Sequence, residues 1–449
     1  MELLMEVLDK IKPSEEERAL VNAVTQEILK IAEEEIVKKD LEVIPRLVGS
    51  IAKDTYLSGD HDVDLFLAFP PEVPLEELRK IGLELGKAIG ERLESYEIAY
   101  AEHPYVRAFY KGFDVDIVPC YNVKSWREVK TAVDRSPLHT EWVIKHLDGR
   151  NDEVRLLKKF LKGINAYGSE VYVRGFSGYL TELLIIKYGS FMNLLESVGF
   201  LARSKIIDLG GWLKKEPEIA YKTVERERES PLIVIDPVDP RRNVASSLSW
   251  EKFGVFYFKA KEFVERPGIE FFFPSKAKTG DYKALLKKKG TNLVTLLFPK
   301  PELVDDILLP QLERSAKGFE KSLKREGFEV FDLNWGYTER AFIMLEVDRV
   351  ERSRVILKPG PEFLSERAID FYSKNQKVWI RGKRLYSEKE VKESIVDVIE
   401  DLLIKNQVAL GKNLRGVIKN AEILINFVPP ELEEEAYLFL SKEKWNIKG

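Results

Sequence analysis

The sequence predicts an α+β protein of several domains, and three observations lead to this prediction. The chain has 449 residues, which at ~150 residues per domain corresponds to about three domains. Segments with apolar residues at helical spacing alternate with short apolar strands bounded by Gly and Pro. Hydrophobic residues make up 44% of the chain, which is enough for ordinary cores and excludes a disordered protein. We expect domains at residues 1–146, 147–265 and 266–449.

The first domain is predicted to hold a small sheet with flanking helices. A helix begins near Ser14, which can cap it ahead of three glutamates. Apolar segments ended by Gly-Ser or Pro-Pro indicate strands, and Lys111-Gly112 marks a tight turn between two more. The expected strands are 45–48, 63–69, 105–109 and 113–119, with a helix over 75–93.

The remaining elements follow a change of pattern near residue 150. Residues 153–213 have mostly helical periodicity and predict a largely helical central domain, with one short strand at 231–237. Beyond residue 266, strands and helices alternate, so the C-terminal region is predicted to be α+β. Its expected elements are strands at 293–298, 328–333 and 341–347 and helices at 308–327 and 389–405.

Composition narrows the classes of function. The single cysteine, Cys120, excludes an intramolecular disulfide framework and a Cys-based zinc cluster. Acidic residues stand where a signal peptide would carry Lys or Arg, and no apolar run is long enough for a membrane span. We therefore expect a cytoplasmic protein with no membrane partner. The net charge of −4 argues against a surface that binds polyanions everywhere, but 275–290 and 405–419 are locally basic.

Three aspartates are the candidate catalytic and metal-binding residues. Asp62 and Asp64 flank Val63 at the start of a strand, so their side chains point to the same face. Asp116 lies in another predicted strand, and if the two strands are adjacent, three carboxylates converge. Such a cluster costs electrostatic energy unless a cation compensates it, and carboxylate oxygens suit Mg²⁺. Each feature alone is common in structural roles, whereas their combination predicts a metal site.

A small-residue turn before these aspartates is the candidate phosphate site. Gly49 and Ser50 follow an apolar strand, and residues 51–57 are expected to open a helix. Backbone N–H groups at such a turn can face an anion. Gly49 would allow phosphates to approach the backbone, the Ser50 hydroxyl could donate to one, and Lys53 could reach the same phosphates.

These segments together resemble the DNA polymerase β-type nucleotidyltransferases, and more narrowly the archaeal class I CCA-adding enzymes. The segments that carry the resemblance run through most of the first 315 residues. They are 49–57, 101–106, 115–121, 132–139, 151–162, 173–179, 236–245 and 304–311. The resemblance implies a polymerase β-like head, a central nucleotide-recognition domain and a C-terminal tRNA-binding body and tail.

The resemblance also implies a reaction and roles for individual residues. The expected reaction is template-independent addition of C, C and A to the 3′ end of tRNA from CTP and ATP, with Mg²⁺ held by Asp62, Asp64 and Asp116. The family commonly has Arg where this chain has Lys53, so the charge is kept but bidentate contact is not. The other residues that match nucleotide-binding positions are His139, Lys158, Tyr167 and Arg242.

Other interpretations remain open at this point. His139 could be a capping or buried histidine, Lys158 a solvated lysine and Tyr167 a packing aromatic residue. Another terminal transferase such as a poly(A) polymerase, or an inactive tRNA-binding protein, is an alternative function. Antibiotic nucleotidyltransferases are shorter and lack a segment like 241–245. A homodimer is one option for the assembly, but no coiled-coil seam indicates an oligomeric state.

Overall fold

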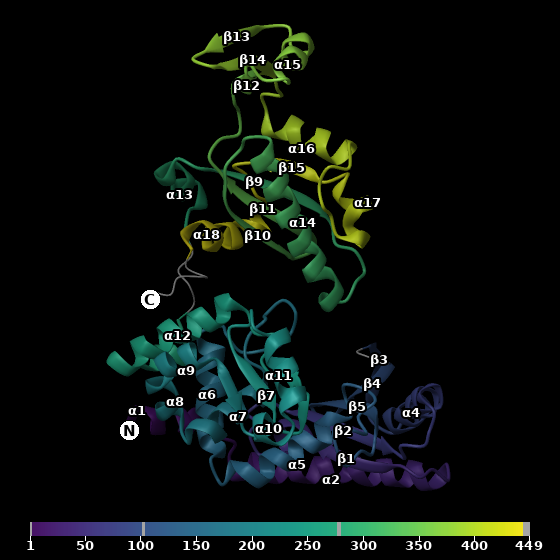
Figure 1. The fold of residues 1–449 in the computed structure, drawn as a ribbon. Helices are drawn as coiled ribbons and strands as arrows, with labels where there is room; N and C mark the ends of the chain where they lie inside the picture. The colour runs from purple at the N-terminus through teal and green to yellow at the C-terminus, as the bar shows by residue number, and fades with distance from the viewer. Residues whose placement is uncertain (1, 101–103, 276–279, 443–449) are drawn as a thin grey trace. The chain divides into compact units, whose positions relative to one another are not determined.

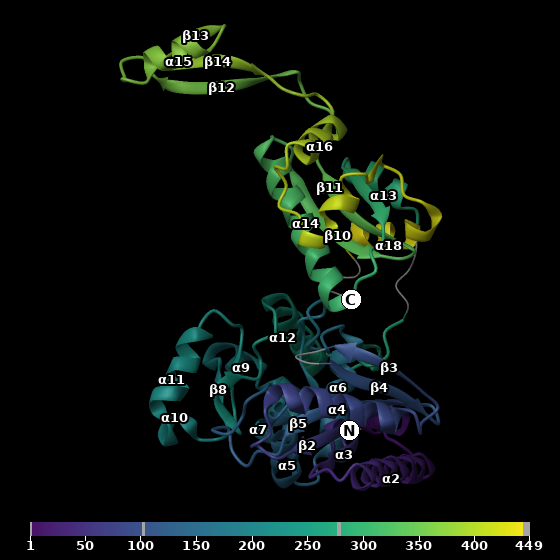
Figure 2. The ribbon, with the colours of Figure 1, turned by 90° about the vertical axis from the view of Figure 1, so that its right-hand side faces the viewer.

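The computed structural model describes residues 2–100, 104–275 and 280–442. The chain folds into two compact units, Met1–Ser275 and Lys276–Gly449. Figures 1 and 2 show helices and strands mixed throughout both units, so the predicted α+β class with more than one domain is confirmed. Among the described residues, no helix is both long enough and apolar enough to cross a membrane.

The N-terminal part of the first unit is built on a five-stranded sheet with the order β1-β2-β5-β4-β3 (Figure 1). The central pair, β2 and β5, runs parallel, and every other neighbouring pair is antiparallel. The hairpin expected around Lys111-Gly112 joins β4 to β5. The strands are β1 (Ile44–Val48), β2 (Asp62–Phe69), β3 (Ser95–Tyr100), β4 (Pro104–Tyr110) and β5 (Phe113–Tyr121).

Two helices cover one face of this sheet. α2 (Glu15–Lys38) is capped by Ser14, whose hydroxyl accepts from the Glu17 N–H at 3.1 Å, as predicted. α4 (Leu75–Gly90) packs against β4 and β5. Along β2, Val63, Leu65 and Leu67 join the core beneath these helices. Because strand side chains alternate, Asp62 and Asp64 are directed to the opposite face.

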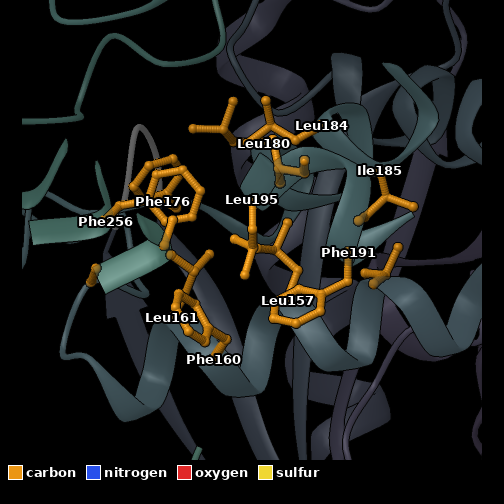
Figure 3. Close-up of a cluster of buried hydrophobic side chains, with 14 of the residues drawn as sticks. Leu157, Phe160, Leu161, Phe176, Leu180, Leu184, Ile185, Phe191, Leu195 and Phe256 are labelled. Carbon is orange, nitrogen blue, oxygen red and sulfur yellow. The ribbon is translucent and has the colours of Figure 1, made fainter. Parts of the chain in front are cut away.

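The rest of the first unit is mostly helical, as predicted for the central region. Figure 3 shows its core, in which Phe160, Phe176, Phe191 and Phe256 pack with leucines from neighbouring helices. A three-stranded sheet of order β6-β7-β8 lies beside this core. The elements are α1 (Glu2–Ile11), α3 (Gly49–Ala52), α5 (Arg135–Leu147), α6 (Asn151–Gly163), α7 (Gly178–Tyr188), α8 (Phe191–Glu196), α9 (Val198–Ser204), β6 (Ile206–Asp208), α10 (Trp212–Lys215), α11 (Pro217–Arg226), β7 (Ile233–Asp236), β8 (Asp239–Asn243) and α12 (Trp250–Glu265).

The second unit contains a four-stranded antiparallel sheet and a smaller three-stranded sheet. The larger sheet has the order β10-β11-β9-β15, with α14 and α16 on one face and α13 and α18 on the other. The smaller has the order β12-β14-β13 and carries α15 (Figure 2). The elements are α13 (Tyr282–Lys289), β9 (Asn292–Pro299), α14 (Asp305–Arg325), β10 (Val330–Tyr337), β11 (Arg340–Val347), β12 (Val355–Glu362), α15 (Ala368–Lys374), β13 (Val378–Arg381), β14 (Arg384–Glu390), α16 (Ile395–Ile404), α17 (Arg415–Ile418), β15 (Glu422–Ile425) and α18 (Glu433–Ser441).

Three expected helices have different bounds in the structure. The helix expected over 51–57 is a single turn at 49–52, because Asp54 takes a left-handed conformation with φ of 51°. The helical pattern expected to run through 201–209 stops at Ser204, and β6 follows in parallel with β7. The helix expected at 389–405 begins only at Ile395, because residues 384–390 form β14, which pairs with β12 and β13. Ser394 caps the start of this helix.

Candidate functional site

The register of β2 and β5 brings the predicted aspartates together. The two parallel strands pair Asp62 with Asp114 and Asp64 with Asp116. All four carboxylates therefore occupy the face of the sheet that α2 and α4 leave uncovered. The sequence predicted that these carboxylates would converge only if the two strands were neighbours, and the sequence alone could not show that they are.

Gly49 is confined by one of these aspartates. β1 is antiparallel to β2, with Val48 opposite Asp64, so the chain turns into α3 directly beside that carboxylate. Gly49 has a φ of 74°, and a Cβ added there would lie 1.8 Å from Oδ2 of Asp64. Only glycine fits this position without moving Asp64. The predicted contact of Gly49 with phosphate stays a prediction, but its packing on Asp64 is an independent reason for a glycine.

The charges at this face are incompletely balanced. Burial, followed by the negative charges of Asp116 and Asp62, raises the pKa of Asp64 to about 6. Burial and neighbouring aspartates also raise the pKa of Asp62. Arg107 on β4 donates from Nε to Oδ1 of Asp116 at 2.9 Å, and this ion pair raises the pKa of the guanidinium. No cation of the described residues lies within ion-pair distance of Asp62 or Asp64.

The donor set fits a hard divalent cation. Aspartate oxygens are ligands that Mg²⁺ prefers, and burial together with the charge of Asp116 raises the pKa of Asp64, so a bound cation would stabilise its ionised form. In the ranges that the structure describes, no three His, Cys, Asp or Glu side chains already converge as a metal cage. Arg107 holds one of the three predicted ligands, Asp116, in an ion pair. The side chains therefore match the cation chemically, but they are not gathered into a cage.

A buried polar network forms the opposite wall of the site. Lys53, with its side chain only 8% exposed, donates from Nζ to Oε2 of Glu182 on α7 at 2.6 Å. Thr55 donates from Oγ1 to Oε1 of the same carboxylate at 2.7 Å. Lys158 on α6 donates from Nζ to the Thr55 carbonyl oxygen at 2.8 Å, and burial lowers its pKa to about 8. The structure therefore does not support the solvated-lysine interpretation of Lys158.

These two walls enclose a cleft of about 730 Å³. The predicted residues that line it are Gly49, Ser50, Lys53, Asp62, Asp64, Asp116, Lys158 and Tyr167. Tyr167 is also buried, which raises the pKa of its hydroxyl. Sequence reasoning did not identify Arg107, Tyr179 and Glu182, which line the cleft too. The signal for Glu182 was available, since it is the one acidic residue in the apolar helix 178–188.

The other two predicted residues, His139 and Arg242, meet at Asp236 beside the cleft. His139 Nε2 lies 2.8 Å and Arg242 Nη1 3.2 Å from Oδ2 of this carboxylate, which is fully buried. Tyr179 donates from its hydroxyl to Oδ1 at 3.2 Å and stacks on the His139 ring, with centroids 4.0 Å apart. Burial alone would raise the pKa of Asp236, but His139 and Arg242 hold it below its ordinary value.

The protonation of His139 follows from the same surroundings. Burial lowers its pKa although the negative charge of Asp236 opposes this effect. Nε2 lies 2.8 Å from a carboxylate oxygen of Asp236, which can only accept, so the imidazole donates a hydrogen bond from Nε2 to Asp236. The structure shows His139 as a largely buried, hydrogen-bonded histidine that contacts Tyr179 of the cleft wall, and its predicted role in nucleotide binding stays a prediction.

Family models cover both units. A nucleotidyltransferase domain matches residues 26–139, the second domain of tRNA nucleotidyltransferase matches 152–273, and the C-terminal domain of CCA-adding enzyme matches 289–426. The first segment contains β1, β2 and β5, and the second contains Lys158, Glu182 and Asp236. The matched domains thus supply both walls of the cleft.

Curated relatives match along almost the entire chain. A CCA-adding enzyme of Thermococcus gammatolerans is 66% identical over 100% of this chain and 99% of its own length. Those of Pyrococcus abyssi (59% identical, 99% of both chains) and Archaeoglobus fulgidus (39% identical, 84% of this chain and 82% of its own) are also similar. Among solved structures, the Cid1 poly(U) polymerase has a TM-score of 0.46 and 15% identity over 60% of this chain and 97% of its own.

Proposed function

Because this chain belongs to the archaeal CCA-adding enzymes, which are tRNA nucleotidyltransferases, we propose that the cleft between β2, β5 and α7 is where it adds C, C and A to tRNA. The substrates would be CTP, ATP and a tRNA that ends before CCA, in the cytoplasm. The observation that carries the proposal is the parallel register of β2 and β5, which aligns Asp64 with Asp116 opposite the Lys53 wall.

The divalent cation of the reaction would be held by Asp62, Asp64 and Asp116, and we propose Mg²⁺. When bound, the cation would neutralise triphosphate charge and favour attack of the tRNA 3′ hydroxyl on the α-phosphorus of the nucleotide. In that attack a bond forms from the 3′ oxygen to the α-phosphorus, and the bond to pyrophosphate breaks. No nucleophile of the protein is required, so the residues contribute by positioning and by electrostatics.

The opposite wall would bind the triphosphate. Ser50 can donate its hydroxyl to a phosphate oxygen, and Lys53 lines the same cleft with a positive charge that acts on Asp64. Glu182 now holds Lys53, and this contact keeps the ammonium directed along the cleft. Tyr167 offers a protonated hydroxyl at any pH near neutrality because burial raises its pKa. Arg107 orients Asp116 through its ion pair.

The test of this proposal is nucleotide incorporation into tRNA that lacks CCA. Wild-type protein should add two C residues with CTP and Mg²⁺ alone, and then one A when ATP is present. Asp62→Asn, Asp64→Asn and Asp116→Asn should each abolish incorporation but leave tRNA affinity largely intact. Asp114→Asn is the matched control, because Asp114 shares their face of the sheet but lies outside the proposed ligand set. A long homopolymer, or near-normal turnover in any of the three variants, would contradict the proposal.

A further inference from the structure

One buried carboxylate joins side chains from three elements beside the cleft. Asp236 at the end of β7 accepts hydrogen bonds from His139 on α5, Tyr179 on α7 and Arg242 on β8. It also accepts from the backbone N–H of Val238 at 3.0 Å. These donors come from segments up to 97 positions away in the sequence. Asp236 opens the family-like segment 236–245, but the sequence did not assign it a role, although it is the point where His139 and Arg242 meet.

We propose that Asp236 is a positioning residue that holds His139, Tyr179 and Arg242 in one arrangement beside the cleft and thereby sets nucleotide selectivity. This inference rests on the proposed function and on the nucleotide-binding roles predicted for His139 and Arg242. Asp236 itself is fully buried and does not line the cleft, so it would act through its partners.

The geometry makes this coupling direct. His139 and Arg242 share a single oxygen, Oδ2, at 2.8 and 3.2 Å, so a shift of either side chain changes the partner of the other. Tyr179 transmits the contact to the cleft, because its hydroxyl bonds Oδ1 while its ring both stacks on His139 and lines the cleft. A nucleotide that displaced Arg242 would therefore disturb His139 and Tyr179 as well. Selectivity depends on such differences between correct and incorrect substrates.

A second aspartate of the same turn, Asp239, provides a control that distinguishes this role from a merely structural one. Asp239 is also fully buried and pairs with two arginines, Arg135 at 2.8 Å and Arg241 at 2.9 Å. None of its hydrogen bonds in the described part of the chain involves His139, Tyr179 or Arg242. Replacing Asp239 by Asn should thus weaken the β7–β8 turn without changing the contacts that we assign to selectivity.

The experiment compares the full-length Asp236→Asn and Asp239→Asn proteins in the addition of the first C to tRNA that lacks CCA. The readouts are kcat and KM for CTP, UTP, ATP and GTP, together with the thermal unfolding midpoint. Asp236→Asn should lower the kcat/KM ratio of CTP over UTP at least tenfold, because the amide cannot hold Arg242 by charge. Asp239→Asn should leave that ratio within about twofold of wild type. A uniform loss for all nucleotides, or equal loss of selectivity in both variants, would overturn the inference.

Two further variants keep the inference testable if Asp236→Asn is unstable. Tyr179→Phe removes only one hydroxyl and should also lower the CTP/UTP ratio, whereas an unchanged ratio would contradict coupling through Asp236. In addition, Asp236→Asn combined with Arg242→Gln should be no less selective than Arg242→Gln alone, since both changes break the same contact. Additive losses would show that Asp236 does not act through Arg242. Failure of the wild-type protein to add CCA would instead refute the proposed function.

Discussion

Replacing Gly49 by Ala should disable catalysis more than it disturbs folding. The added Cβ would lie 1.8 Å from Oδ2 of Asp64, whereas Cβ contacts shorter than 3.0 Å essentially do not occur. Either the carboxylate or the turn must therefore move by roughly 1 Å, and a misplacement of about 1 Å can cost on the order of 100-fold in rate. The positive φ of 74° adds a backbone cost of about 1–2 kcal/mol for a residue with a Cβ.

The assay is single-turnover addition of C to tRNA lacking CCA, together with thermal unfolding. We expect Gly49→Ala to be slowed about 100-fold and its midpoint to fall by roughly 2–8 °C, at about 2–4 °C per kcal/mol for a unit of this size. Gly149→Ala is the control, because Gly149 has a φ of 71° but no atom within 4 Å of an added Cβ. If both variants add C at similar rates, the contact between Gly49 and Asp64 does not matter for catalysis and the reasoning is refuted.

Further predictions concern charged residues in the opposite wall of the cleft and in the second unit. Glu182→Gln leaves Lys53 buried without its partner, so the free energy of unfolding should fall by about 3–5 kcal/mol. Added CTP should restore more stability to Glu182→Gln than to wild type in thermal unfolding, and equal shifts would argue against phosphate binding by Lys53. The pKa of Lys158 is about 8 in the folded chain against an ordinary value of 10.5, so the unfolded chain binds more protons between these values. The stability of wild type relative to Lys158→Met should therefore rise with pH across that window, by up to about 3 kcal/mol, in denaturant titrations at several pH values. A flat difference would show that burial does not lower the pKa of Lys158. In the basic 405–419 segment, Lys412, Arg415 and Lys419 are exposed, and replacing all three by Gln should make the salt dependence of tRNA binding shallower by about 2 in log–log slope. An unchanged slope would remove this segment as a tRNA face.

Local sequence signals predicted much of the first unit. The cap at Ser14, the turn at Lys111-Gly112 and the alternation along β2 depend on residues close in the sequence, and the structure confirms each of them. The remaining basic candidate segment, 275–290, includes residues 276–279, which lie outside the described residues, as do positions 101–103 of one family-like segment. The domain boundaries at 146 and 265 stay predictions.

Where a segment with a helical pattern also had a strand to pair with, the tertiary pairing decided its secondary structure. The predicted helix at 389–405 overlaps the end of β14 (384–390), which pairs with β12 and β13, so α16 starts six residues later than predicted. In the same way, residues 206–208 become a strand because β7 offers them a parallel partner. Backbone hydrogen bonds to a distant strand outweighed intrinsic helical preference at both places.

By itself, the sequence predicted which residues would carry the chemistry: three aspartates on strands, a Gly-Ser turn and a lysine after it. Only the tertiary structure decided which partners they have. Glu182 lies 129 positions from Lys53, and Asp236 lies 97 positions from His139, yet these pairs are in hydrogen-bond contact. The periodicity of a sequence indicates which face of its own helix or strand a side chain occupies. A buried charge needs a partner, and that partner can come from any segment that the fold brings close.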